Sequence, residues 1–154
     1  MLIENILTPE CTFSNTPGIS KKRTLETISQ SIANIYPAIN VETLFTALIN
    51  RERLGSTGIG YGIALPHCRL AACQQIIGSL VKLDKAVDYD SIDKQPVDIL
   101  FMLLVPEIAT EEHLQTLSML VKRFKQVEYR KILRQSESSL ELYHAAVNFR
   151  VMKT

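Results

Sequence analysis

The sequence predicts an α/β fold in a single domain, with a β-sheet between two layers of helices. Three observations indicate this fold. Hydrophobic periodicity is helical towards both ends of the chain and strand-like in the middle, an order typical of layered α/β domains. Residues 97–105, VDILFMLLV, are apolar at nearly every position, as expected of a strand with helices over both faces. The 154 residues, 46% of them hydrophobic, suit one domain with its own core.

The first part of the chain is predicted to hold an irregular arm and two helices. Residues 1–19 carry turn signals at Pro9, Asn15 and a Pro-Gly pair, which favour an arm without regular structure. Each helix follows a residue whose side chain can cap it, Ser20 for the first and Asn40 for the second. The apolar stripes are Leu25, Ile28, Ile32 and Ile35 in the first helix, which Pro37 ends, and Val41, Leu44, Phe45 and Leu48 in the second, which Gly55 follows.

Three strands and two further helices are predicted in the rest of the chain. A short apolar segment at 63–65 and longer strands at 76–83 and 97–105 supply the sheet. Helical periodicity then returns, first in a helix with Thr110 as its cap and again over residues 138–148. The apolar face of the first of these two helices is predicted to be Leu114, Leu117, Val121 and Phe124.

Composition and charge exclude several classes of protein. The sequence holds 17 Lys and Arg against 16 Asp and Glu, so it lacks the basic excess typical of nucleic-acid-binding domains. The longest apolar run, 99–105, is too short to cross a bilayer, and the N-terminus lacks the features of a signal peptide. Cys11, Cys68 and Cys73 form an odd set without the pattern of a disulfide framework, which favours reduced thiols. We expect a cytoplasmic protein that neither binds nucleic acid nor inserts into a membrane.

The most informative segment is GSTGIGYGIALPHCRL, residues 55–70, in which four glycines lead into a proline and His67. Glycine permits positive φ and close approach to the backbone. The segment is not a nucleotide P-loop, because no Lys-Ser or Lys-Thr pair follows its glycines. It is not a dinucleotide-binding fingerprint either, because Ile63 stands where that motif needs its third glycine.

His67 is the candidate nucleophile of this segment. A neutral imidazole is nucleophilic near pH 7, and histidine forms covalent intermediates in group transfer. A phosphorylated imidazole would carry about two negative charges. Backbone N–H groups, Ser56, Thr57 and an arginine are the donors available to such a group. A lone histidine after a strand is more often structural, and spacing alone leaves the two interpretations of His67 balanced.

A second histidine, His113, falls in the first turn of the helix that Thr110 is predicted to cap. The positive end of the helix dipole keeps such an imidazole neutral and attracts anions. His113 could therefore orient His67 or hold phosphoryl oxygens, although its position alone favours a surface residue without function. We interpret His144, near the C-terminus, as structural or exposed.

Two other chemistries would use some of the same residues. A zinc site could combine His67, Cys68, Cys73 and His113, because the two cysteines have the spacing of paired zinc ligands. No paired histidine follows them, which counts against such a site. An acyl-transfer pair of Cys68 and His67 is excluded, because adjacent residues of a strand point to opposite faces.

Residues 51–70, RERLGSTGIGYGIALPHCRL, resemble the active-site segment of enzyme IIA proteins of the phosphoenolpyruvate-dependent phosphotransferase system, of the fructose, mannitol and nitrogen-regulatory type. Residues 87–120, VDYDSIDKQPVDILFMLLVPEIATEEHLQTLSML, are similar to the downstream region of that family. LTPEC at 7–11 and SKKRTLE at 20–26 resemble the nitrogen-regulatory members. The resemblance implies that residues 1–154 form one domain of this type, with a mixed β-sheet flanked by helices on both faces.

The resemblance also implies a three-residue site. His67 matches the phosphorylated histidine, Arg51 the arginine that contacts the phosphoryl group, and His113 an auxiliary active-site histidine. Ser56 and Thr57 fall in the matching loop and are expected to help bind the phosphate. Neither a metal nor a cofactor is implied.

The implied function is that of a phosphoryl carrier, a phosphotransferase component rather than an enzyme that turns over alone. A histidine phosphocarrier protein would load His67, and the phosphorylation state would regulate partners such as potassium transport or sensor-kinase systems. The alternatives are the IIA component of a fructose- or mannitol-type sugar transporter and, less favoured, a zinc-binding module. Cys68 stands where the family often has glycine, which raises the question of thiol oxidation beside the nucleophile.

Overall fold

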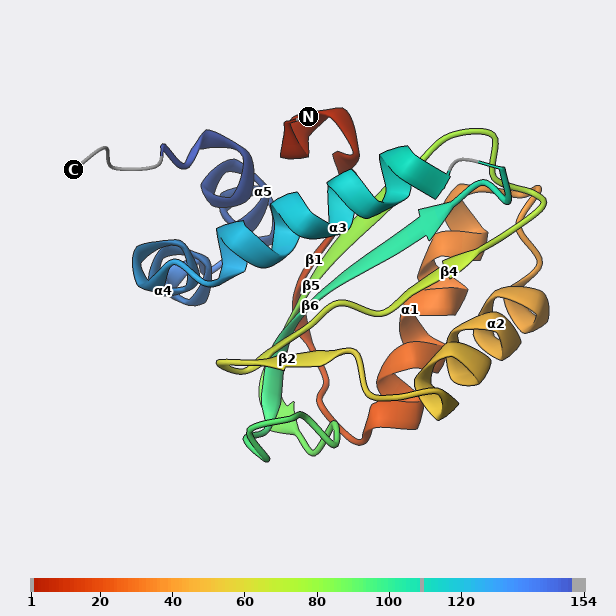
Figure 1. The fold of residues 1–154 in the computed structure, drawn as a ribbon. Coiled ribbons are helices and arrows are strands. Elements are labelled where there is room, and N and C mark those ends of the chain that lie inside the picture. The colour runs from red at the N-terminus through yellow and green to blue at the C-terminus, as the bar shows by residue number, and fades with distance from the viewer. Residues whose placement is uncertain (1, 109, 151–154) are drawn as a thin grey trace.

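The computed structural model describes residues 2–108 and 110–150 and contains one mixed sheet between two layers of helices, as predicted (Figure 1). The strand order is β1-β5-β6-β3-β2, and β4 pairs with β6 beyond the end of β3. The strands are β1 (Leu7–Thr16), β2 (Gly58–Gly60), β3 (Ile63–Ala64), β4 (His67–Arg69), β5 (Ile77–Val87) and β6 (Val97–Val105). The helices are a 3-10 turn (Ile3–Asn5), α1 (Lys21–Ile35), α2 (Val41–Arg53), α3 (Thr110–Phe124), α4 (Val127–Gln135) and α5 (Ser139–Asn148).

The central strand β6 separates two hydrophobic cores. Figure 1 shows α1 and α2 on one face of the sheet and α3, α4 and α5 on the other. Leu100, Met102 and Leu104 join the core under α1 and α2, whereas the alternate residues of β6 join the core under α3 to α5. This alternation explains why residues 99–105 are apolar throughout. The second set from β6 is Ile99, Phe101, Leu103 and Val105.

The helix starts agree with the sequence prediction. Oγ of Ser20 accepts a hydrogen bond from the backbone N–H of Arg23 at 3.1 Å, and Oδ1 of Asn40 accepts one from Thr43 at 3.0 Å. Such caps satisfy N–H groups that the first turn of a helix leaves unpaired. The side chain of Thr110, which the sequence predicts as a third cap, lies outside the described part of the structure.

The predicted irregular arm over residues 1–19 is wrong, because residues 7–16 form β1 and pair in parallel with β5. The turn signals are accommodated because β1 is an edge strand with two register irregularities. Pro9 lacks an N–H but is tolerated at an edge, and Asn15 adopts a positive φ of 58° near the end of the strand.

Two further differences concern the C-terminal helices. α4 is not predicted by the sequence, and it begins after Gln126, which makes no side-chain cap. Its buried Tyr129 and Leu133 are too short a pattern to predict a helix alone. On α3, Leu114 was predicted on the apolar face but is 66% exposed. Leu120, which was not predicted there, is fully buried. No helix among residues 2–108 and 110–150 is long and apolar enough to cross a bilayer.

The site is positioned by one extended segment that runs along β6. Ile63 lies opposite Ile99 and His67 opposite Leu103, so the register is unchanged from β3 to β4. Pro66 interrupts the ladder because it has no N–H, but its carbonyl oxygen still accepts a hydrogen bond from Leu103 at 2.9 Å. β4 therefore continues the path of β3 and passes between α2 and the start of α3 (Figure 1).

Candidate functional site

His67 is the first residue of β4, and its imidazole is half-buried and held by the backbone. Nδ1 lies 2.8 Å from the carbonyl oxygen of Leu65. A carbonyl oxygen only accepts hydrogen bonds, so Nδ1 carries the ring hydrogen. Nε2 is left with its lone pair, which makes it the nucleophilic atom of the ring.

Arg51, in the last turn of α2, contacts that nucleophilic atom. Its Nε–H group donates to Nε2 of His67 at 3.3 Å, which agrees with a lone pair on Nε2. Its Nη1 donates to the carbonyl oxygen of Gly55 at 2.9 Å, which anchors the guanidinium on the turn that follows α2. The side chain thus connects His67 with the glycine segment.

His113, in the first turn of α3, also lies next to the ring of His67. The two ring centroids are 5.7 Å apart, and the ring planes meet at 66°. His113 is only 8% exposed, and its Nε2 has no hydrogen-bond partner among the described residues. Three residues far apart in the sequence, Arg51, His67 and His113, therefore meet where α2, β4 and α3 converge.

Both histidines are biased towards the neutral form. Burial lowers the pKa of His67 below its ordinary value, and Arg51 lowers it further, while the hydrogen bond to Leu65 opposes this shift. Burial also lowers the pKa of His113, with further contributions from His67 and Arg69. Arg69 was not predicted as part of the site, although its position two residues after His67 on the same strand is a usable signal.

The hydroxyl groups of Ser56 and Thr57 donate to groups other than His67. Ser56 donates to the backbone oxygen of Tyr89 at 3.0 Å, and Thr57 donates to the carboxylate of Glu52. In this state the two side chains hold the shape of the loop. Their contact with a phosphoryl group stays a prediction.

Glu52 was not predicted and is the main addition that the structure makes to the site. Its side chain is 6% exposed and pairs with Lys21 at 2.9 Å. Nothing in the sequence RER at 51–53 distinguishes this carboxylate from the solvent-exposed charges common at helix ends.

The cysteine chemistries find no support. Among residues 2–108 and 110–150, no three His, Cys, Asp or Glu side chains gather in a group that could hold a metal ion. Cys68 points into the core under α1 and α2, away from the His67 side of β4. Burial raises the pKa of the Cys68 thiol to about 12, so the reactive thiolate is scarce at neutral pH.

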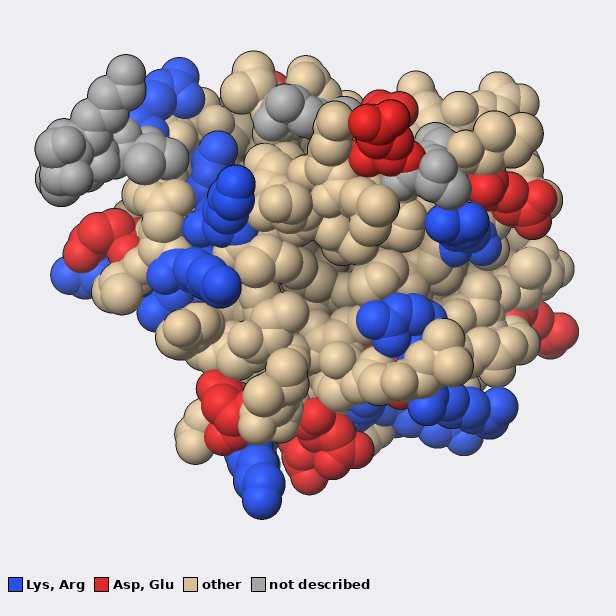
Figure 2. Space-filling model, in the orientation of Figure 1, with Lys and Arg blue, Asp and Glu red and all other residues tan. Residues whose placement is uncertain are grey.

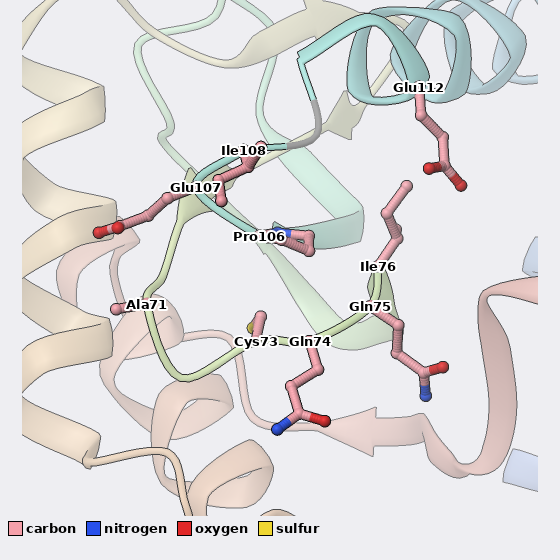
Figure 3. A pocket seen from close by; sticks show the side chains of 9 residues that line it. All are labelled: Ala71, Cys73, Gln74, Gln75, Ile76, Pro106, Glu107, Ile108 and Glu112. Atoms are coloured by element: carbon pink, nitrogen blue, oxygen red, sulfur yellow. The ribbon is translucent and has the colours of Figure 1, made fainter.

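A cavity of about 590 Å³ lies between the segment that follows β4 and the start of α3 (Figure 3). β4 and α3 are the two elements that carry His67 and His113. In Figure 3 the carboxylate of Glu112 points towards the loop at 73–76. The cavity is lined by Ala71, Cys73, Gln74, Gln75, Ile76, Pro106, Glu107, Ile108 and Glu112.

Charged groups of both signs occur on the face drawn in Figure 2, with uncharged surface between them. Glu111 and Glu112 lie in the first turn of α3, and Lys122 and Arg123 lie in its last turn. Negative charge at the N-terminus of a helix and positive charge at its C-terminus interact favourably with the helix dipole, so these four residues stabilise α3.

The chain is similar to known proteins over nearly its whole length. Residues 5–146 match the family described as "Phosphoenolpyruvate-dependent sugar phosphotransferase system, EIIA 2". A "Nitrogen regulatory protein" of Pseudomonas aeruginosa is 47% identical over 95% of each chain, and one of Escherichia coli K12 is 42% identical over 92% of this chain and 86% of the relative.

Solved structures agree with these relatives. The nitrogen regulatory protein IIA-Ntr of Neisseria meningitidis superposes with a TM-score of 0.86 at 35% identity, covering 94% of this chain and 98% of that chain. IIA mannitol of Escherichia coli superposes with a TM-score of 0.73 at 16% identity, covering 90% and 97%, a likeness of fold.

Proposed function

Because the chain belongs to the phosphoenolpyruvate-dependent sugar phosphotransferase system EIIA 2 family, we propose that Nε2 of His67 accepts a phosphoryl group from a phosphorylated histidine carrier protein. The observation that carries the proposal is the hydrogen bond from Nδ1 of His67 to the oxygen of Leu65. It leaves Nε2 as a free base, and the guanidinium of Arg51 lies beside it.

The transfer step exchanges one phosphorus–nitrogen bond for another. The lone pair of Nε2 attacks the phosphorus atom while the bond to the donor imidazole breaks, and the departing imidazole keeps the electron pair. Positive charge develops on the ring of His67 as the new bond forms. The Leu65 carbonyl stabilises this charge through Nδ1–H, just as it favours the protonated form of the free ring. The exchange is nearly balanced, so alignment and charge stabilisation are the main requirements.

Arg51 is suited to hold the oxygens of the transferring group. Its guanidinium presents several N–H donors in one plane and stays charged at any working pH. A phosphoryl group on Nε2 would take the place of the present hydrogen bond from Nε. Nη1 can keep its anchor on Gly55 while the other N–H groups donate to phosphoryl oxygens.

His113 is suited to donate a further hydrogen bond. Its ring is buried next to His67, and Nε2 has no partner among the described residues. A buried polar atom without a partner is costly, so a phosphoryl oxygen near Nε2 would relieve that cost. The lowered pKa of His113 favours a neutral ring. A neutral imidazole has one N–H group, which it can donate to a phosphoryl oxygen.

We further propose that the phosphorylation state of His67 regulates partner proteins, potassium transport or sensor-kinase systems among them. Support comes from relatives named nitrogen regulatory proteins, which are similar to this chain from end to end. The second candidate is delivery of phosphate to a sugar transporter. A "PTS system fructose-specific EIIA component" of Haloferax volcanii favours it, but that match, 36% identical, covers only 60% of this chain.

Incubation with phosphoenolpyruvate and the two upstream phosphotransfer proteins tests the carrier proposal. One acid-labile phosphate per chain is expected on the wild type, and none on His67→Ala. If His67→Ala accepts the phosphate as well as the wild type does, the proposal is wrong.

A second assay separates the two candidate roles. The phosphorylated protein is mixed with the IIB domain of a fructose- or mannitol-type transporter. Slow or absent transfer is expected for a regulatory protein, whereas rapid transfer would favour the sugar-transport role.

A further inference from the structure

Glu52 is a nearly buried carboxylate that the proposed transfer step does not use. Its Oε1 accepts hydrogen bonds from Nζ of Lys21 at 2.9 Å and from the backbone N–H of Thr57 at 3.1 Å. Its Oε2 accepts one from the Thr57 hydroxyl. The Tyr89 hydroxyl lies 3.3 Å from Oγ1 of Thr57 and must donate to it, because Thr57 has given its own hydrogen to Glu52.

The position of Glu52 is unfavourable for α2 taken alone. It lies in the last turn of the helix, where the helix dipole disfavours negative charge. Burial of a carboxylate is costly unless the group is paired and hydrogen-bonded. The contacts with Lys21 and Thr57 offset that cost, and they fix Thr57 through both its backbone and its side chain. A carboxylate kept in such a place indicates a role beyond helix stability.

The first route from Glu52 to the nucleophile passes through Thr57 and Leu65. The backbone oxygen of Thr57 accepts a hydrogen bond from the N–H of Leu65 at 2.9 Å. The carbonyl oxygen of the same residue, Leu65, accepts the hydrogen bond from Nδ1 of His67 at 2.8 Å. Thr57 therefore holds the residue that decides which ring nitrogen of His67 carries the hydrogen.

The second route passes through the turn between Arg51 and Thr57. Gly55, two residues before Thr57, accepts the hydrogen bond from Nη1 of Arg51 at 2.9 Å. A Cβ at Gly55 would meet no atom within 4 Å, so the turn is open there and receives little packing. The hydrogen bonds between Glu52 and Thr57 close this turn and so fix the carbonyl group that orients the guanidinium.

We propose that Glu52 and Thr57 are positioning residues for phosphoryl transfer at His67. Their hydrogen bonds hold Leu65 against Nδ1 of the histidine and Gly55 against Arg51, so one buried contact sets both the tautomer of the nucleophile and the place of its cationic partner. The kinetic consequence rests on the proposed function of His67, whereas the effect on the tautomer does not.

Three variants test the proposal. Thr57→Val removes the hydroxyl and keeps the shape of the side chain, and Thr57→Ser restores the hydroxyl as a matched control. Glu52→Gln keeps the volume of the side chain and removes its charge. The tautomer of His67 is read from the ¹⁵N chemical shifts of its ring, and phosphoryl transfer is measured against the concentration of the phosphorylated carrier protein.

In Thr57→Val and Glu52→Gln we expect a maximal transfer rate about 10- to 100-fold below wild type. The carrier concentration at half-maximal rate should stay the same. Part of His67 should move from the Nδ1–H to the Nε2–H tautomer, whereas Thr57→Ser should match the wild type in both measurements. A merely structural residue would lower the amount of folded protein without changing the tautomer of the folded fraction.

A single Nδ1–H tautomer with a wild-type maximal rate in both variants would overturn the proposal. So would an unchanged maximal rate with weaker carrier binding, because that result places the two residues in docking. If Glu52→Gln does not fold, the pair Thr57→Val and Thr57→Ser decides the question. If the wild type accepts no phosphate, the proposed function fails, and the tautomer populations still decide whether the positioning exists.

Discussion

Nε of Arg51 lies 3.3 Å from Nε2 of His67, so the guanidinium occupies the side of the ring where a phosphoryl group would bond. This contact stabilises the free base and lowers the pKa of His67. It also keeps the cation at the place where the negative charge of a phosphoryl group on Nε2 would lie. Arg51 can exchange the contact with Nε2 for contacts with phosphoryl oxygens without leaving its anchor on Gly55.

Substitution of Arg51 should lower the transfer rate in proportion to the donors that are lost. We expect Arg51→Ala to slow transfer by about 100-fold or more, as loss of a transition-state donor does elsewhere. Arg51→Lys keeps the charge but loses the planar fork, so its rate should lie between those of Arg51→Ala and the wild type. Single-turnover transfer from the phosphorylated carrier measures both, and a wild-type rate for Arg51→Lys would exclude a bidentate contact.

The transfer rate should depend on pH through His67. The pKa of His67 lies below its ordinary value of 6.5, so the ring stays neutral and nucleophilic at pH 7. The rate should fall only as the pH drops below 6.5, towards the lowered pKa. A titration of His67 by NMR gives that pKa independently. The midpoint of the rate profile should coincide with the NMR midpoint once the profile has been corrected for the titration of the donor protein. A His67 midpoint above 6.5 would contradict the structure.

The stability of the fold should decrease with acidification over the same range. For His67 and His113 the pKa is lower in the folded protein than the ordinary value of 6.5, so the unfolded chain binds more protons below that value. Their contribution is fully present above pH 6.5 and is lost as the pH falls through the folded pKa values. Urea unfolding at pH 7.5 and 5.5 measures the loss. The loss should be smaller in a variant in which both histidines are replaced by Gln.

Two of the three residues that meet at the site carry a sequence signal of their own, and the family resemblance supplies the third. His67 follows a glycine-rich segment and a proline, His113 opens a helix, and Arg51 enters through the family resemblance. The sheet places His67, since β4 continues the path of β3 along β6. The end of α2 and the start of α3 bring Arg51 and His113 to it. Glu52 could not be predicted in this way, because its burial arises only when Thr57 folds back onto the end of α2.

The elements that the sequence missed have local causes. β1 contains a proline and an Asn at φ 58°, which normally indicate turns, but the strand lies at the edge of the sheet and needs hydrogen bonds on one side only. α4 has no capping side chain and only one helical pair of buried residues. The longer elements, such as β6 and α1, were predicted because their periodicity extends over many residues.

Substitution of His113 should slow transfer while leaving the fold intact. Nε2 of this residue has no partner among the described residues, and its ring lies 5.7 Å from that of His67. We expect His113→Ala to reduce the maximal transfer rate by about 10- to 100-fold. His113→Gln should retain more activity, because its amide N–H can still donate. Equal rates for the wild type and His113→Ala, with both proteins shown folded by circular dichroism, would remove His113 from the site.

Gly58, in the segment before His67, lies too close to Ser91 to carry a side chain without a clash. A Cβ at Gly58 would overlap the hydroxyl of Ser91 and lie 2.9 Å from its Cβ, and the backbone of Ser91 is 3.0 Å away. Gly58→Ala should therefore destabilise the fold by about 1–3 kcal/mol, measured by urea unfolding. Addition of Ser91→Gly removes the side-chain overlap but not the backbone contact, so the double variant should recover only part of the loss.

Gly55→Ala is the matched control for that clash. Gly55 has a φ of 151°, at which the backbone of an alanine would be strained. A Cβ there would, however, meet no atom within 4 Å. Its substitution should therefore cost about 1–3 kcal/mol from the backbone alone, without any clash. Because Gly58 follows Thr57 directly, its clash should also displace the residue that holds Leu65. A Gly58→Ala variant as stable as the wild type would show that Ser91 can move away freely, and the predicted clash would then be wrong.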